Sequence, residues 1–298
     1  MNTAIKETTP DKIFKVFNYS ILTVAMVAVL YPLVFIISAS ISDPAAVNSG
    51  KMWLYPIDIT FEGYQRVFND PKIWVGYRNT IFYTALGTFI NLFVTLPASF
   101  ALSRRDFIGR NFFMTMFVVT MFLSGGLIPS YLLVKNLGLM NSVWALVLPN
   151  AAAIWHIIVC RTFFQSTIPE DLEDAAKIDG ASIFHFFAKV VLPLSTPIIA
   201  VMALFYGVDH WNSYFNAMIY LSDTSKYPLQ LVLREILVLQ EMSTNVNNLD
   251  GAALQNQANI AAIMKYAVML VATLPLIIVY PFMQRFFVQG VMIGSVKG

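Results

Sequence analysis

Residues 174–197, DAAKIDGASIFHFFAKVVLPLSTP, form a charged stretch that contains an Asp-Gly pair and two prolines. The stretch lies between two of the most apolar segments of the chain. Within it, hydrophobic residues recur at intervals of three and four, which is typical of amphipathic helices. Gly180 interrupts this pattern and predicts a left-handed residue at the end of a helix. We therefore expect two short helices that meet at Gly180.

Capping residues mark the ends of these two helices. Thr167, followed by Pro169 and by Glu170 three residues on, predicts the start of the first helix. Ser182 predicts the start of the second helix, and Pro193 predicts its end.

The first of the two helices has one small apolar face and one charged face. The apolar face holds Leu172, Ala175 and Ala176, and the charged face holds Glu170, Glu173, Asp174 and Lys177. An amphipathic pair lying on the membrane surface would explain the periodicity. It would not explain the small side chains, which hold weakly to lipid and suit docking into a protein groove.

The composition is that of a membrane protein. Of the 298 residues, 57% are hydrophobic and 12% are charged, whereas a soluble domain has about 45–50% apolar and about 25% charged residues. The formal net charge of +2 shows no excess of the kind that nucleic-acid binding requires. The single cysteine, Cys160, cannot form an internal disulfide, and the three histidines lack the spacing of metal ligands. No metal site is expected.

Six apolar runs are long enough to cross ~30 Å of hydrocarbon, for which ~20 residues are needed. They lie at about 17–39, 77–102, 112–134, 142–163, 194–220 and 260–284. The predicted fold class is therefore all-α, a single polytopic membrane domain over residues 1–298 with six transmembrane helices. The first run is longer than the about 7–15 residues of a signal-peptide core, so we interpret it as a retained helix.

Basic residues predict the orientation of these spans. Arg104, Arg105 and Arg110 occupy the turn after the second span, and three lysines precede the first span. Because positively charged loops stay in the cytoplasm, we expect both segments there. An even number of spans then places both termini and residues 167–193 in the cytoplasm and residues 221–259 outside.

The fifth span carries polar side chains at intervals of three and four residues. They are Tyr206, Asp209, Ser213, Asn216 and Tyr220, with His210 beside them. On one continuous helix they would share a face, and a charge at this depth should face the bundle interior or a water-filled cavity. Two interpretations stay open: the stripe lines a substrate path, or Asp209 and His210 pair with a neighbouring helix for structural reasons.

Three short motifs follow one another in residues 174–197 at a characteristic spacing. They are Asp174-Ala175-Ala176, Asp179-Gly180-Ala181 and Leu192-Pro193-Leu194, followed by Pro197. This arrangement resembles the EAA loop of the inner-membrane permeases of binding-protein-dependent ABC importers, whose pattern is E-A-A-x-x-x-G with a later leucine-proline. The resemblance implies a type I importer permease fold and a cytoplasmic coupling loop at 167–193.

The same resemblance implies which residues dock on the ATPase. They are Glu173, Asp174, Ala175, Ala176, Asp179, Gly180 and Ala181. Asp174 stands where the family usually has glutamate, and Glu173 precedes it. Either of these two carboxylates is therefore a candidate for the charged contact with the ATPase.

Further motifs resemble the carbohydrate-uptake branch of this family. They are SGGLIP at 124–129, LPN at 148–150 and the tail QGVMIGSVKG at 289–298. The likeness is strongest to the subgroup that imports oligosaccharides released from complex polysaccharides. In the related maltose permeases a Val-Lys-Gly tail reaches between the two ATPase subunits. This implies ATPase contacts for Gly294, Ser295, Val296, Lys297 and Gly298.

The resemblance also implies partners in the membrane of a bacterium. They are a sister permease that completes a heterodimeric pore, two ATPase subunits and an extracytoplasmic sugar-binding protein. The chain has no G-x-x-x-x-G-K-[ST] phosphate loop, so ATP and Mg²⁺ are expected on the ATPase subunits, and this chain is expected to bind no cofactor and to be no enzyme.

The segment between the fifth and sixth spans fits the same scheme. Residues 228–242 predict an amphipathic outer helix, and the polar residues 243–259 predict a solvated loop. The loop lies where, in the maltose permeases, an outer loop enters the sugar cleft of the binding protein. Hydroxyls and rings of the polar stripe would then contact the oligosaccharide in the membrane.

Two rival functions are weighed against this hypothesis. An ion-coupled secondary transporter would use Asp209 as its coupling site. A membrane enzyme would need paired carboxylates or a histidine-rich metal cluster, and the sequence provides neither.

Overall fold

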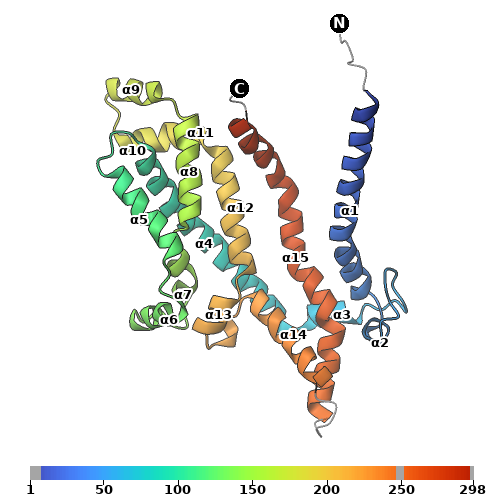
Figure 1. The fold of residues 1–298 in the computed structure, drawn as a ribbon. Coiled ribbons are helices and arrows are strands. Elements are labelled where there is room, and N and C mark those ends of the chain that lie inside the picture. Colours follow the sequence, from blue (N-terminus) through green and yellow to red (C-terminus); the bar gives the residue numbers. More distant parts are fainter. Residues whose placement is uncertain (1–7, 246–251, 296–298) are drawn as a thin grey trace. The chain divides into compact units, whose positions relative to one another are not determined.

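The computed structural model describes residues 8–245 and 252–295, and every regular element in these ranges is a helix (Figure 1). The chain divides into two compact units. One consists of Met1–Asp70 and Glu235–Ala272, and the other consists of Pro71–Arg234 and Thr273–Gly298. The second unit contains most of the residues with a predicted function.

The first unit contains α1 (Thr9–Ser40), α2 (Pro44–Asn48) and α3 (Glu62–Asn69), together with parts of α14 (Leu229–Asn245) and α15 (Ala252–Ser295). Side chains of α1 are exposed along most of its length, as lipid or another subunit would require. In α3, a Cβ atom on Gly63 would lie 2.6 Å from the carbonyl oxygen of Ile263, so these two helices touch through their backbones.

The second unit is built around α4 (Pro71–Ser103), α8 (Ile154–Thr167) and α12 (Thr196–Asn212), which pack on one another. Its other elements are α5 (Arg110–Phe122), α6 (Leu127–Asn136), α7 (Trp144–Val147), η1 (Leu148–Asn150), α9 (Glu170–Ile178), α10 (Ile183–Phe186), η2 (Phe187–Val191), α11 (Leu192–Leu194), α13 (Phe215–Tyr220) and η3 (Thr224–Lys226). Helices α14 and α15 follow η3 and contribute residues to both units.

The core of the second unit lies where α4, α8 and α12 meet. Its buried side chains are Leu96, Phe100, Cys160, Phe163, Phe164, Phe186, Val191, Ile198, Met202 and Tyr206. Phe186 and Val191 belong to the segment that follows Gly180, so this segment is packed into the core. The amphipathic pattern of residues 183–190 reflects that packing.

Three helices of the described ranges are long and apolar enough to cross a membrane by themselves: Thr9–Ser40, Pro71–Ser103 and Ala262–Phe282. Three further candidates are pairs of helices that bend sharply at a short break. The pairs are Arg110–Phe122 with Leu127–Asn136, Trp144–Asn150 with Ile154–Thr167, and Ile183–Leu194 with Thr196–Asn212, and their bends are 113°, 52° and 81°. The count reaches six when each bent pair is one span.

The spans predicted over 112–134 and 142–163 are thus each broken into two helices, near the glycine pair Gly125-Gly126 and near Pro149 respectively. The first is interrupted where Gly126 adopts φ +84° and ψ 179°, a conformation that residues with a side chain avoid. The second is interrupted at Leu148–Asn150, a single 3-10 turn that contains Pro149, and the chain then becomes extended at Ala153.

The expected helix over 194–220 is also broken. Helix α12 ends at Asn212 because Ser213 is extended, with φ −71° and ψ 116°, and α13 begins only at Phe215. At the other end, η2 is a π-helix, and Ser195 separates α11 from α12.

The helix predicted over 228–242 is confirmed, since α14 covers Leu229–Asn245. The predicted loop over 243–259 is wrong in its extent. Helix α14 continues through Asn245 and α15 starts at Ala252, so only residues 246–251 of that loop lie outside the described residues. Residues with good helix propensity, the apolar Ala and Leu and the polar Gln, occur in 252–259 and explain the earlier start of α15.

Candidate functional site

Helix α9 carries the first half of the charged stretch. Its first turn holds Glu170, Asp171 and Glu173, which the positive end of the helix dipole favours. Thr167 was expected to cap this helix, and that expectation was wrong. Thr167 is the last residue of α8, and Pro169 occupies the N-cap position of α9 without a side-chain hydrogen bond.

The end of α9 agrees with the prediction. Gly180 has φ +75°, and its N–H donates to the carbonyl of Lys177 at 3.0 Å. The N–H of Ala181 donates to the carbonyl of Ala176 at 2.9 Å, which completes a Schellman motif. Ser182 then caps α10, since its hydroxyl accepts a hydrogen bond from the N–H of His185 at 3.2 Å.

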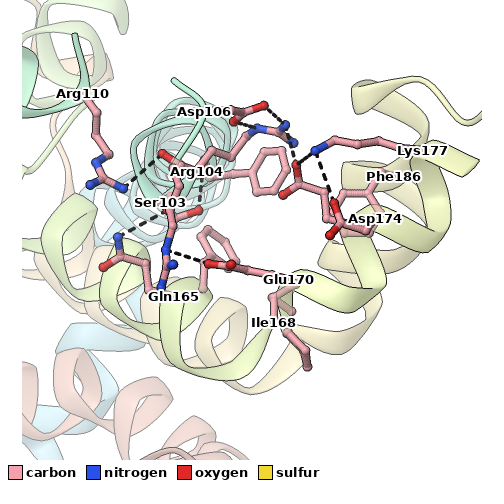
Figure 2. Close-up of a pocket in the computed structure, with 15 residues that line it drawn as sticks. Ser103, Arg104, Asp106, Arg110, Gln165, Ile168, Glu170, Asp174, Lys177 and Phe186 are labelled. Carbon is pink, nitrogen blue, oxygen red and sulfur yellow. Dashed lines mark hydrogen bonds and ion pairs between the residues drawn. The ribbon is translucent and has the colours of Figure 1, made fainter. Parts of the chain in front are cut away.

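An ion network joins α9 to the turn after α4 (Figure 2). Nη2 of Arg104 lies 2.6 Å from Oε1 of Glu173, and the same guanidinium donates to both carboxylate oxygens of Asp106 at 2.9 and 2.5 Å. Nζ of Lys177 lies 2.9 Å from Oε1 of Glu173. The Arg104 side chain is only 8% exposed, so this is a buried charge with two partners.

The carboxyl end of α4 is held in the same place. Its last carbonyl groups, which have no partner within the helix, accept hydrogen bonds from neighbouring side chains. The contacts are Arg161 Nε to the carbonyl of Leu102 at 2.9 Å, Gln165 Nε2 to Ser103 at 3.3 Å and Arg110 Nη1 to Arg104 at 3.3 Å. Gln165 and Arg110, together with the ion network, line a cavity of about 410 Å³.

The network shifts the titration of its members. Hydrogen bonds to Asp106 raise the pKa of the Arg104 guanidinium, and the same contacts lower the pKa of the Asp106 carboxyl. The hydrogen bond to Glu173 raises the pKa of the Lys177 ammonium. These contacts stabilise the charged forms of Arg104, Asp106 and Lys177.

Helix α9 presents different groups on its two sides. Glu173 faces α4, whereas the Asp174 side chain is 71% exposed and its nearest ion pair, with Lys177, is 3.6 Å long. Ala176 is half-buried against the core, and Ala175, Asp179 and Gly180 are exposed. Beyond them, Ile178 is 87% exposed, so α9 offers a surface that combines a carboxylate with apolar groups.

A second site is a polar cavity of about 340 Å³ in the membrane-spanning part of the second unit. Its lining residues are Asn91, Leu146, Asn150, Ala152, Ala153, Tyr206, Asp209, His210 and Ser213. Four of the six residues of the predicted path therefore line one cavity. The carboxylate of Asp209 is exposed in this chain, and the ring of Tyr206 is buried with its hydroxyl 2.7 Å from Thr95 Oγ1.

The other two residues of the predicted stripe lie elsewhere, because the helix breaks at Ser213. Tyr220 is buried on α13 and stacks on Tyr131 with ring centroids 6.3 Å apart. Asn216 is half-buried on the same helix. Neither residue lines the polar cavity, so the prediction of one shared face over 206–220 was wrong.

The prediction missed Asn91, which organises this cavity. Its side chain is fully buried, donates through Nδ2 to the carbonyl of Asn150 at 2.6 Å, and accepts through Oδ1 from His210 Nε2 at 2.7 Å. Gly87, one turn earlier on α4, leaves room for the His210 ring. The signal for Asn91 was an amide within an apolar span, where a polar group needs partners.

The predicted tail lies mostly outside the described residues. Gly294 and Ser295 form the end of α15, and Val296, Lys297 and Gly298 are not described. Contact of this tail with the ATPase therefore stays a prediction.

The sequence matches the family model described as "binding-protein-dependent transport system inner membrane component" over residues 73–293. Protein LplC of Bacillus subtilis is 38% identical over 291 residues, which cover 98% of this chain and 97% of that protein. The polygalacturonan/rhamnogalacturonan transport system permease protein YtcP of Bacillus subtilis is 38% identical over 289 residues, which cover 97% and 99%.

A similar fold is known from a crystal structure of a bacterial ABC transporter involved in the import of the acidic polysaccharide alginate. The match has a TM-score of 0.83 and 34% sequence identity, and it covers 95% of this chain and 100% of that chain. The sequence relatives and the solved structure therefore indicate the same kind of protein over nearly the whole length of this chain.

Proposed function

The chain belongs to the family of binding-protein-dependent transport system inner membrane components, and from this membership we propose that it is the permease subunit of an ABC importer that carries an oligosaccharide across the bacterial cytoplasmic membrane. Relatives named for polygalacturonan/rhamnogalacturonan, arabinooligosaccharides and melibiose/raffinose/stachyose support a sugar cargo. Membership also favours an ATP-driven importer over an ion-coupled carrier based on Asp209.

Helix α9 is the observation that carries this proposal. It lies outside the candidate spans, is anchored to α4 through Glu173, and presents Asp174 and Ile178 outward. A rigidly held helix with an exposed carboxylate beside apolar side chains suits a protein partner. We assign α9 and its Gly180 turn to ATPase docking, with Asp174 rather than Glu173 available for the charged contact.

The polar cavity is the proposed part of the sugar path. Tyr206, Asp209, His210 and Ser213 provide a ring, a carboxylate, an imidazole and a hydroxyl around one space. Hydroxyl-rich ligands are held by such hydrogen-bonding groups together with aromatic faces. Tyr220 and Asn216 are assigned to packing instead.

The partners follow from the same proposal. A sister permease completes the pore, two ATPase subunits bind ATP and Mg²⁺, and an extracytoplasmic binding protein delivers the sugar. This chain then binds no cofactor and catalyses no reaction. Both termini and α9 lie in the cytoplasm, with Arg104, Arg105 and Arg110 on the cytoplasmic face as the positive-inside rule requires.

The test is sugar uptake by the complex, purified through a tag on this chain with its permease and ATPase partners and reconstituted in proteoliposomes. Uptake is measured for oligogalacturonides, alginate oligosaccharides, arabino-oligosaccharides and raffinose, with the binding protein outside and ATP inside. We expect uptake of at least one of these sugars only when ATP and the binding protein are both present. A proton ionophore should leave it unchanged.

Uptake that proceeds without ATP and collapses with the ionophore would instead establish an ion-coupled carrier. Absence of uptake for all four sugars, in a complex that hydrolyses ATP in response to its binding protein, would exclude these oligosaccharides and retain the importer.

A further inference from the structure

Polar contacts fix the amino-terminal part of α4 to the segment that leads into α14. Asn79 Nδ2 donates to the carbonyls of Ser225 and Tyr227 at 2.8 and 3.1 Å. The hydroxyl of Thr80 accepts from the N–H of Leu229 at 2.8 Å. Because Asn79 and Thr80 are buried, water does not readily replace these bonds.

The middle of α4 is bonded to the walls of the polar cavity. Asn91 joins the helix to His210 of α12 and to Asn150. One turn later, Thr95 is hydrogen-bonded to the hydroxyl of Tyr206 at 2.7 Å. A displacement of α4 would therefore move the groups that line the cavity.

The carboxyl end of α4 is joined to α9 by two ion pairs of different burial. Arg104 pairs with Glu173 at 2.6 Å, with side chains 8% and 21% exposed. Arg105 pairs with Glu170 at 2.7 Å, with side chains 80% and 62% exposed. Both pairs link the same two segments, and only the first is shielded from water.

We propose that Arg104 is a positioning residue that makes α9 and α4 move as one body, so that a force applied to α9 reaches the polar cavity and the start of α14. The inference rests on the proposed function, since the force comes from an ATPase docked on α9. It assigns the two adjacent carboxylates of α9 different tasks. Glu173 transmits movement within this chain, and Asp174 faces the partner.

Burial is the reason why Arg104 can transmit force. Separation of α9 from α4 would leave a buried guanidinium with fewer partners, and removal of one partner from a buried pair is strongly unfavourable. The charges of an exposed pair such as Arg105 with Glu170 are solvated whether or not the pair is formed, so the pair contributes little to holding the two segments together. Arg105, the residue next to Arg104, therefore provides a matched control.

The test follows the accessibility of the polar cavity in the complete transporter. Ser213 lines the cavity and is half-buried, so Ser213→Cys in a Cys160→Ser background reports on it, and the Cys160→Ser complex alone gives the background signal. The rate of labelling by a water-soluble maleimide is measured with and without MgATP and vanadate, in the presence of the binding protein. The variants are Arg104→Gln, Glu173→Gln and the control Arg105→Gln.

In the parental background we expect nucleotide to change the labelling rate by about tenfold, a usual size for coupling between sites. Arg104→Gln and Glu173→Gln should bring the ratio of the two rates to about one, while the nucleotide-free rate and the amount of co-purified ATPase stay unchanged. Arg105→Gln should keep the parental ratio. Glu173→Gln is the milder variant, because Arg104 retains Asp106 in it.

An unchanged nucleotide response in both variants would overturn the inference and leave the proposed function intact. Loss of the ATPase from both purified complexes would also overturn it, since Arg104 would then serve docking itself. Absence of a nucleotide response in the parental complex would count against the proposed function.

Discussion

Nε2 of His210 lies 2.7 Å from Oδ1 of Asn91, and Gly87 stands one helical turn before Asn91 on α4. A Cβ atom on Gly87 would lie 2.3 Å from this same Nε2 atom. The imidazole is thus held between a hydrogen-bond partner and a position that tolerates only hydrogen. This arrangement fixes where His210 lines the polar cavity.

Gly87→Ala should displace His210 and break its hydrogen bond to Asn91. Overpacking of this kind costs about 1–3 kcal/mol, so the thermal unfolding temperature of the purified complex should fall and uptake should drop. Gly207→Ala on α12 is the control, because a Cβ atom there meets its nearest neighbour, Thr88 Oγ1, at an ordinary 3.8 Å. Equal unfolding temperatures for the two variants would contradict the packing argument.

Gly180→Val should impair coupling without loss of insertion into the membrane. The residue has φ +75° and no atom within 4 Å of its Cβ position, so the effect comes from the backbone alone. A β-branched residue in the left-handed region costs roughly 1–2 kcal/mol, whereas asparagine visits this region more readily. ATP-dependent uptake should fall for Gly180→Val and persist for Gly180→Asn. If both variants transport alike, the Schellman turn does not matter for docking.

Asp209→Asn should retain most of the uptake, since the amide keeps the shape and the hydrogen-bonding capacity of the carboxylate. Asp209→Ala should reduce uptake further, because it removes the contact group from the polar cavity. Initial uptake rates with the sugar that the parental complex accepts test both variants. A carrier driven by protons would lose transport in Asp209→Asn, and that loss, together with parental uptake that an ionophore abolishes, would contradict the ATP-driven mechanism.

Asp106→Asn should reveal the pH dependence of the ion network. Arg104 lowers the pKa of Asp106 below its ordinary value of 3.8, so the carboxylate stabilises the folded state above that pH. This contribution is lost as the pH falls through the lowered pKa. The difference in unfolding temperature between parent and variant should therefore be present at neutral pH, shrink once the pH falls below the ordinary value, and disappear below the lowered pKa.

The size of this difference should be small, because the Asp106 side chain is 55% exposed and solvent screens its charge. Asp171→Asn removes an exposed acid of α9 outside the Arg104 network and provides the control. A difference for Asp106→Asn that grows on acidification would mean that the pKa is raised instead.

Local features of residues 174–197 were predictable because they depend on residues close by in the sequence. The Gly180 turn and the Ser182 cap are set by backbone conformation and by side chains within four residues. Long apolar runs likewise predict spans, since the thickness of the bilayer sets their length.

The bend angles of the broken spans and the contacts between distant residues were not predictable in this way. A glycine pair such as Gly125-Gly126 marks a point where a span can break, but neither it nor an apolar run carries information about how far the helix direction changes there, and nothing in the sequence marked Ser213 as a break. The pairing of Arg104 with Glu173 joins residues 69 positions apart by their numbers, and only the packing of α4 on α8 brings them together. Sequence spacing placed Tyr220 with Tyr206 for the same reason, because it assumed an unbroken helix.

The break at Ser213 also changes the electrostatic character of the polar cavity. It places the carboxyl end of α12, the negative pole of a helix dipole, beside the carboxylate of Asp209. The two contributions have the same sign, so this wall attracts hydroxyl protons and repels anions. Uronate groups of an acidic sugar would be turned away from this wall, whereas the hydroxyl faces of the same sugar would be drawn to it.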